Sequence, residues 1–261
     1  MWSALASAAL AIPVASAAAP ASAAPPSPVV YDALGDSYAS GYGVPPYSET
    51  CGRSSAAYAV RLDGRMRIDL DDFAACAGAT TDSLEANQLW ALDEETDLVT
   101  VSIGGNDIGW GNVVAACVAG SDPQCAGAVV ATTTRITNTL PDLLRDTYSK
   151  IVAAAPDAHV VVTGYPRLFS PEHGSYYNAS ADEQQAMNDG ADLLNTVIAG
   201  VAAEYGFQFV DVTKRFIGHG VNAPDPWILG LTDPALFHPN LSGYKAYTAA
   251  VTSAVNPRDL R

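Results

Sequence analysis

Residues 29–38 read VVYDALGDSY, and they join an apolar, β-rich run to a turn that carries a serine. In parallel α/β folds, ligands bind in the crevice at the carboxyl ends of the strands. A serine at a strand-to-helix turn can point its Oγ into that crevice. Gly35-Asp36-Ser37 also suits an ordinary turn, because glycine permits positive φ and Asp and Ser bond back to the local backbone. Ser37 is therefore a candidate nucleophile that needs partners elsewhere in the chain.

The same alternation of apolar run, turn and helical pattern recurs along the chain. Together with right-handed crossovers, it predicts an α/β fold, a doubly wound three-layer α/β/α sandwich with a central parallel sheet of about five strands. The predicted strands are 29–34, 67–71, 97–103, 158–163 and 207–212. The predicted helices are 55–63, 126–154, 181–204 and 242–254, of which Pro156 ends the second. Ser180 and Glu183 predict a capping box at the start of the helix at 181–204.

A leader precedes this fold. Residues 1–24 are rich in alanine and contain A-x-A-like patterns at 15–17 and 21–23, which predicts a secretory signal peptide cleaved near residues 23–28. Residues 25–261 then form a single domain that is long enough to bury a sizeable core. Because no other segment is long and apolar enough to span a bilayer, we expect no stable membrane insertion. The leader predicts that the protein is secreted, and we expect it to be monomeric. The Lys/Arg-rich start of such leaders is missing, so the natural start is expected upstream of Met1.

The charge and the cysteines narrow the class of protein further. The formal net charge is −15 at pH 7 and comes from Asp and Glu scattered along the chain. Nucleic acids and anionic membrane surfaces require clustered Lys and Arg, so neither is expected as a partner. The four cysteines of an exported chain favour disulfides, and their spacing suggests no metal site. Three pairings are possible, and Cys51–Cys76 with Cys117–Cys125 is preferred because it closes two loops without crossing the chain. Both disulfides are expected on connections.

Three later segments offer what a nucleophilic serine lacks by itself. Gly78 in ACAGATT (75–81) can bring its backbone N–H close to a substrate, and Asn106 in SIGGND (102–107) offers an amide donor. His238 in LFHPN (236–240) supplies a base with a pKa near 7, which a serine hydroxyl needs to lose its proton at neutral pH. The N–H groups of Ser37 and Gly78 and the Asn106 amide would form a three-donor oxyanion hole. This chemistry requires no cofactor.

These residues resemble, in kind and in chain order, the four blocks of the secreted GDSL or SGNH hydrolases, which centre on Ser, Gly, Asn and His. The resemblance implies an SGNH hydrolase-like, flavodoxin-like fold over residues 25–261 and a serine hydrolase that cleaves carboxylic esters of small molecules or lipids. It also implies that Ser37 forms the acyl-enzyme and that His238 is the general base and acid. CGRS (51–54) and Pro226-Trp227 are similar to the extracellular esterases and lipases of actinomycetes.

The chain departs from this family at one position. Most members place an Asp three residues before the histidine, where this sequence has Ala235. Resemblance to the dyad members implies that a backbone carbonyl, of Ala235 or of Leu236, accepts the Nδ1–H of His238. Such a neutral acceptor fixes the tautomer but stabilises the imidazolium less than a carboxylate does. The alternative acceptor for the Nδ1–H of His238 is the Asp233 carboxylate, which a bend at Pro234 would bring to the ring.

The substrate and its pocket stay open at this point. Tyr38 and Trp227 are candidates for the pocket wall, although Trp227 is equally plausible as a buried anchor. Loops are expected at 38–50, 108–126 and 165–180, and their geometry would set the acyl and alcohol preference. The alternatives to an esterase or lipase are a phospholipase, a carbohydrate acetyl esterase on the same scaffold, or a non-enzymatic extracellular binding protein.

Overall fold

The computed structural model describes residues 1–2, 27–255 and 260. In this part of the chain, five parallel strands form the central sheet, in the order β4-β1-β5-β6-β7. They are β1 (Val29–Gly35), β4 (Ile68–Phe73), β5 (Leu98–Ser102), β6 (His159–Thr163) and β7 (Gln208–Val210). Each of them overlaps a strand that the sequence predicts. A short antiparallel ribbon, β2 (Tyr47–Ser48) and β3 (Arg53–Ser54), stands apart. From residue 3 onward, the predicted signal peptide lies outside the described residues.

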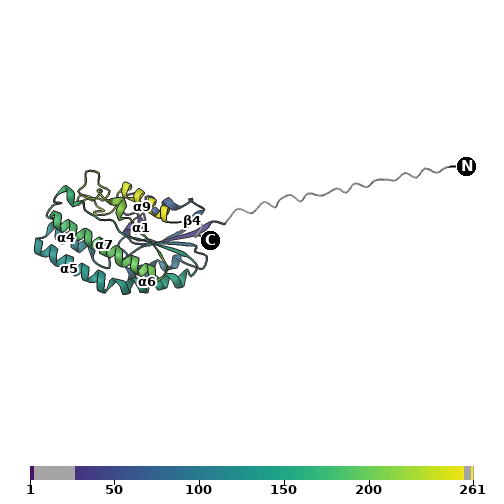
Figure 1. Cartoon of the computed structure of the whole chain (residues 1–261), viewed down its shortest axis with the longest axis horizontal. Coiled ribbons are helices and arrows are strands. Elements are labelled where there is room, and N and C mark those ends of the chain that lie inside the picture. Colours follow the sequence, from purple (N-terminus) through teal and green to yellow (C-terminus); the bar gives the residue numbers. More distant parts are fainter. Residues whose placement is uncertain (3–26, 256–259, 261) are drawn as a thin grey trace.

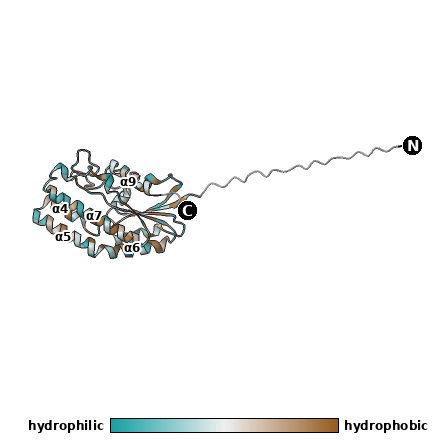
Figure 2. Ribbon diagram, viewed as in Figure 1, coloured by the Kyte–Doolittle hydropathy of each residue, from teal (hydrophilic) through white to brown (hydrophobic). Residues whose placement is uncertain are grey.

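Helices cover both faces of this sheet, which confirms the three-layer α/β/α sandwich. α4 to α7 lie along one face and α9 along the other (Figure 1), with α3 against α6 and with α2 and α8 against α9. Figure 2 shows apolar residues on the strands and both apolar and hydrophilic residues on the covering helices. The bounds are α1 (Ser37–Ser40), α2 (Tyr58–Leu62), α3 (Thr81–Asn87), α4 (Trp110–Ala119), α5 (Asp122–Asn138), α6 (Leu140–Ala154), α7 (Ala181–Glu204), α8 (Thr213–Phe216) and α9 (Leu241–Ala254), with short 3₁₀ turns at Leu89–Ala91 and Pro171–His173.

One predicted helix and one predicted loop need correction, and one predicted helix cap is confirmed. The single helix predicted over 126–154 is two helices, α5 and α6, because Pro141 in the first turn of α6 cannot donate a hydrogen bond within a continuous helix. α4 occupies most of 108–126, where a loop is expected. The capping box of α7 is present, since the Ser180 hydroxyl accepts from the Glu183 N–H and the Glu183 carboxylate accepts from the Ser180 N–H.

The strand order creates a crevice between β1 and β5. In chain order the sheet runs 2-1-3-4-5, the flavodoxin-like arrangement, so the chain leaves β1 and β5 toward opposite sides. Ligands of such sheets bind at this switch point, beyond the carboxyl ends of the strands. Ser37 follows β1 directly, and the turn Gly104–Asn106 follows β5. The fold therefore brings two of the four sequence blocks to one crevice.

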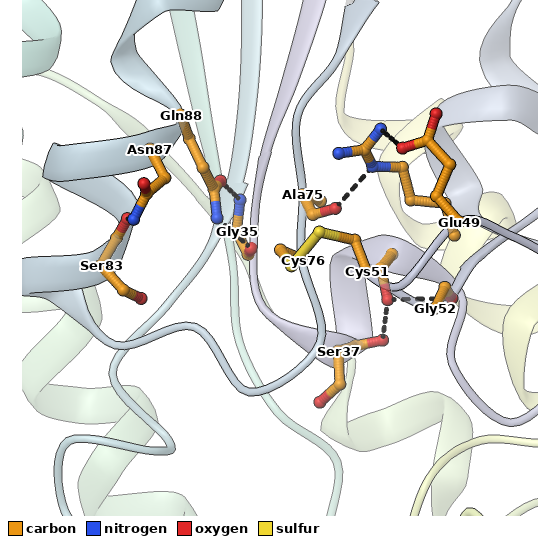
Figure 3. The surroundings of a disulfide bond; sticks show 12 residues. Gly35, Ser37, Glu49, Cys51, Gly52, Ala75, Cys76, Ser83, Asn87 and Gln88 are labelled. Carbon is orange, nitrogen blue, oxygen red and sulfur yellow. Dashed lines mark hydrogen bonds and ion pairs between the residues drawn. A yellow bond between two sulfur atoms is a disulfide. The ribbon is translucent and has the colours of Figure 1, made fainter.

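Gly35 sets how closely these two strands approach at their ends. It has φ = +129° and pairs with Ser102, and a Cβ at Gly35 would lie 2.5 Å from the Ser102 carbonyl oxygen. The side chain of Gln88, at the end of α3, accepts from the Gly35 N–H at 2.7 Å and donates to its carbonyl at 2.9 Å (Figure 3). The position is thus closed to every residue except glycine.

We expect Gly35→Ala to lower the free energy of unfolding by about 3 kcal/mol, because it combines a positive φ with a backbone clash. Gly127→Ala is the matched control: Gly127 is exposed on α5, and no heavy atom within the described residues comes within 4 Å of its added Cβ. That control should raise stability by about 0.5 kcal/mol. Urea unfolding measures the free energy of unfolding of both variants. Equal changes in that free energy would contradict the role given to Gly35.

Candidate active site

Ser37 is the first residue of α1, and its turn is held on several sides. The Asp36 carboxylate caps the helix by accepting from the Tyr38 N–H at 2.9 Å. The Tyr244 hydroxyl lies 2.8 Å from the Tyr42 carbonyl and 3.2 Å from the Ser37 carbonyl, at the far end of this turn. Because the first N–H groups of a helix have no partner within it, the Ser37 N–H is available to a substrate oxygen. The turn therefore presents both a hydroxyl and a donor at the crevice.

The structure brings His238 to this serine. The loop before α9 carries His238, whose Nε2 lies 2.7 Å from Ser37 Oγ. The side chain is buried, and this burial lowers the pKa of His238 below its usual value of 6.5, although the hydrogen bond to the Leu236 carbonyl raises it in part. The imidazole is consequently neutral at pH 7. With Nδ1–H donating to a carbonyl, Nε2 is the nitrogen that can accept the Ser37 proton.

The group that orients the imidazole is Leu236, the second of the two carbonyls considered. His238 Nδ1 lies 3.0 Å from the Leu236 oxygen, whereas the Ala235 carbonyl accepts the backbone N–H of His238 at 3.2 Å. The reason is the backbone of Phe237, which has φ = +59° and turns the Leu236 carbonyl toward the ring. Phe237 is fully buried, and its carbonyl accepts from the Tyr38 hydroxyl at 2.7 Å. Of the two carbonyls expected, that of Leu236 is therefore the one within hydrogen-bonding distance of Nδ1.

Asp233 does not take this place either. Its Oδ2 accepts from the Gly230 N–H at 3.0 Å, which closes a local turn. The rival triad is thus not formed in the structure. Ser37 and His238 form a dyad, and a neutral backbone oxygen, that of Leu236, takes the place of the third residue of a triad.

Aromatic rings enclose the imidazole of His238. Tyr42 meets it edge-on at 5.0 Å between ring centroids, Tyr38 lies at 5.3 Å and Trp110 at 6.0 Å. Tyr38 also lines the cavity beside Ser37, as the sequence suggests. Trp227 instead stacks on His219 at 3.6 Å, and among the described residues it is not part of that cavity wall. Trp227 is half-buried, so it matches neither the expected wall of this cavity nor a fully buried anchor.

Gly78 and Asn106 lie on adjoining turns. Gly78 has φ = +84°, and no heavy atom in the described ranges lies within 4 Å of where its Cβ would be, so it faces open space. The Asn106 Nδ2 donates one N–H to the Ala79 carbonyl at 2.8 Å, which leaves its second N–H for a ligand. The Asp107 carboxylate accepts from the Thr81 hydroxyl at 2.6 Å and its N–H at 3.1 Å. These bonds join the turn after β5 to the start of α3.

The two disulfides have the pairing preferred from the sequence. Cys51 is bonded to Cys76, and Figure 3 shows this bridge beside the Ser37 turn. The Cys76 N–H donates to the Gly35 carbonyl at 2.9 Å, so the bridge fixes the segment leading to Gly78. The second disulfide joins Cys117 of α4 to Cys125 of α5, and thus links two helices rather than the connections expected.

An apolar cavity begins at Asp36, Ser37 and Tyr38 and runs between α4, α5 and α7. Its deeper wall consists mainly of aliphatic side chains from these helices: Val113, Val114, Val129, Ile136, Met187 and Leu194. The Cys117–Cys125 disulfide connects two of the three helices that form it. The cavity can therefore hold an apolar group beside the Ser37 hydroxyl.

Three residues around the site lie outside the four sequence blocks. Gln88 holds both backbone groups of Gly35, Trp110 packs on His238, and Tyr165 bonds to the serine turn. Tyr165 had a usable signal, since it follows the predicted strand 158–163 by two residues, at the carboxyl edge of the sheet. Trp110 lies in 108–126, a segment predicted from the sequence to shape the substrate preference, whereas Gln88 comes from a segment without any pattern that points to the crevice.

A nucleophilic serine with a buried histidine at the switch point of a doubly wound sheet defines a class of serine hydrolases. The GDSL-like Lipase/Acylhydrolase family matches residues 33–246, and the chain belongs to this family. It is therefore a carboxylic ester hydrolase. Among the described residues, no helix is both long and apolar enough to cross a membrane.

Relatives of known name support the same class. The chain is 38% identical over 219 residues to Lipase 1 of Streptomyces coelicolor, covering 82% of this chain and 81% of that protein. It is 37% identical over 230 residues to a lipase of Streptomyces rimosus, covering 86% of each. Two crystal structures superpose closely. The extracellular lipase from Streptomyces rimosus has a TM-score of 0.84 at 35% identity, over 87% of this chain and 100% of that one. Phospholipase A1 from Streptomyces albidoflavus has a TM-score of 0.83 at 34% identity, over 88% and 100%.

We expect Asp233→Asn to change kcat by less than about threefold, because the Asn oxygen still accepts from the Gly230 N–H and Leu236 still orients His238. Disabling the orienting Asp of a true triad lowers kcat by about 10⁴-fold. Steady-state hydrolysis of a chromogenic ester gives the measurement. A fall in kcat of a hundredfold or more in a folded variant would show that Asp233 is the orienting group.

Proposed function

We propose that the chain is an extracellular lipase that hydrolyses carboxylic esters of long acyl chains, with Ser37 as the nucleophile. The single observation that carries this proposal is the 2.7 Å contact between His238 Nε2 and Ser37 Oγ at the mouth of an apolar cavity. Extracellular action is supported by the predicted leader at 1–24, by the two disulfides and by the extracellular lipase of Streptomyces rimosus.

The proposed reaction has two halves. In the first, Ser37 Oγ attacks the ester carbonyl carbon while His238 Nε2 takes the hydroxyl proton. The tetrahedral intermediate collapses, His238 returns the proton to the leaving alcohol oxygen, and an acyl-Ser37 ester remains. In the second half, water loses a proton to His238 and attacks this ester, and the acid is released as Ser37 regains its proton. Each half passes through an intermediate with a negatively charged oxygen.

Three N–H donors are proposed to bind that oxygen: the backbone groups of Ser37 and Gly78 and the free N–H of Asn106. Each is fixed before substrate arrives, Ser37 by the Asp36 cap, Gly78 by the nearby disulfide and Asn106 by the Ala79 carbonyl. Such preorganised donors act on the transition state because they need no reorganisation during reaction, and removing one typically lowers kcat about 10²–10³-fold.

The cavity supports a lipase over a carbohydrate acetyl esterase. An acetyl group has a single methyl to bury, whereas the aliphatic wall between α4, α5 and α7 suits a longer chain. Each buried methylene contributes about 0.8 kcal/mol to binding. A phospholipase is the second candidate, supported by the 34% identity to phospholipase A1 from Streptomyces albidoflavus. Its substrate would place an acyl chain in the same cavity.

We expect wild-type kcat/KM to be higher for octanoyl and palmitoyl esters than for acetyl esters of one alcohol. Gly190 of α7 lines the cavity, and no described heavy atom outside its own helix backbone lies within 4 Å of its added Cβ. Gly190→Leu should therefore fill the cavity and lower kcat/KM for palmitoyl esters about tenfold, as if two methylenes lost their contacts. Acetyl ester hydrolysis should stay unchanged.

Gly200→Leu is the matched control, because Gly200 lies exposed on the same helix. It should leave the whole chain-length profile unchanged. Strict preference of the wild type for acetyl esters would favour the acetyl esterase, and hydrolysis of phosphatidylcholine at a comparable rate would favour the phospholipase. Absence of ester hydrolysis in the folded wild type would contradict both the proposal and its alternatives.

A further inference from the structure

A buried tyrosine joins the two halves of the proposed site. Tyr165 lies just beyond the end of β6, and its hydroxyl reaches across to the turns that follow β1 and β5. It donates to Asp36 Oδ2 at 2.5 Å and accepts the N–H of Gly105 at 3.1 Å. Asp36 caps the helix that begins at Ser37, and Gly105 directly precedes Asn106. A single hydroxyl thus bonds to the neighbour of the nucleophile and to the neighbour of the oxyanion donor.

Packing fixes where this hydroxyl lies. A Cβ on Gly105 would be 3.2 Å from the Tyr165 ring, so the ring rests directly against the backbone of the asparagine turn. On its other side, the ring meets Tyr38 edge-on with 5.2 Å between centroids. Tyr165 is itself buried and lines the cavity beside Ser37. Its oxygen has little freedom to follow either turn if that turn moves.

The hydrogen bond from the Tyr165 hydroxyl favours the carboxylate form of Asp36 over the protonated form. Burial raises the pKa of Asp36 to about 7, while hydrogen bonds from the Tyr165 hydroxyl and the Tyr38 N–H act in the opposite direction. Tyr165 therefore favours the carboxylate form, which is the better acceptor for capping the helix at Ser37. Bonds to a charged acceptor are shorter and about twice as strong as those between neutral groups.

We propose that Tyr165 is a positioning residue, which fixes the Asn106 amide relative to Ser37 Oγ through its bonds to Gly105 and Asp36. The inference rests on the oxyanion role proposed for Asn106. That role requires a donor about 2.7–3.1 Å from an oxygen that exists only in the intermediate. The Asn106 side chain is tethered to Ala79, and the Asp107–Thr81 bonds hold the far side of the turn. Tyr165 is the tether on the side of Ser37.

Tyr165→Phe tests this proposal because it removes the hydroxyl and keeps the ring. We expect kcat for a chromogenic ester to fall about tenfold to a hundredfold, with KM within about twofold, because the lost alignment matters in the transition state. The matched control is Tyr205→Phe, which removes a hydroxyl that donates to the Arg145 carbonyl at 2.8 Å, on the joint between α6 and α7. That control should leave kcat unchanged.

A double-mutant cycle with Asn106→Ala separates positioning from general loss of structure. If Tyr165 acts by aligning Asn106, its loss should lower kcat less than about threefold once the amide is gone. The proposal would be overturned if the fold-reductions in kcat of the two single variants multiply in the double variant. It would also be overturned if Tyr165→Phe changes KM alone or leaves kcat unchanged.

Asp36→Asn provides a second route if Tyr165→Phe does not fold. The Asn side chain keeps an oxygen that can accept from the Tyr38 N–H, but it lacks the second carboxylate oxygen to which Tyr165 donates. Asp36→Asn should likewise lower kcat, and it should lower kcat by a smaller factor when Asn106 is already alanine. If the two fold-reductions in kcat multiply in the double variant, the proposal is overturned. A folded wild type without esterase activity would overturn the proposed function and this inference together. An active wild type with an equally active Tyr165→Phe variant would overturn this inference alone.

Discussion

The close approach of Gly35 to Ser102 is the constraint on which the rest of the site depends. It lets β1 end against β5 with no side chain between them, at the point where the chain turns away to both faces of the sheet. Gln88 takes up both backbone groups of Gly35, and the Cys76 N–H bonds its carbonyl. Ser37, two residues further on, therefore projects from a rigid strand end, and the disulfide-linked segment that carries Gly78 is anchored to the same residue.

The imidazole of His238 is oriented by a backbone carbonyl, with no carboxylate among its hydrogen-bond partners within the described residues. Burial lowers the pKa of His238, so the base is neutral when substrate binds, and the Leu236 carbonyl selects the tautomer. Asp36, which directly precedes Ser37 in the chain, caps the helix of Ser37 and bonds to Tyr165 instead of to the imidazole. The carboxyl group of Asp36 therefore supports the serine turn, while the orientation of His238 depends on the backbone.

The sequence predicts the strands and the four blocks because both depend on local patterns. Apolar runs followed by turns identify the five strands, and their parallel order places Ser37 and Asn106 at one edge. The missed elements depend on distant contacts. The first half of α4 contains weak helix formers, Gly111 and the β-branched Val113 and Val114, and the helix is held by packing on α5 and by the disulfide at Cys117. The choice of Leu236 over its neighbour rests on a positive φ that only the folded chain imposes.

In the proposed mechanism, Ser37, His238 and three N–H donors converge on one ester beside an apolar cavity. A crystal structure of the chain after reaction with a long-chain alkylphosphonate tests it most directly, because the phosphonate mimics the tetrahedral intermediate. The account predicts phosphorus bonded to Ser37 Oγ, with its free oxygen within hydrogen-bonding distance of the Ser37 and Gly78 N–H groups and of Asn106 Nδ2, and with the alkyl chain between α4, α5 and α7. Phosphorus on another residue, or a free oxygen directed away from these donors, would contradict it.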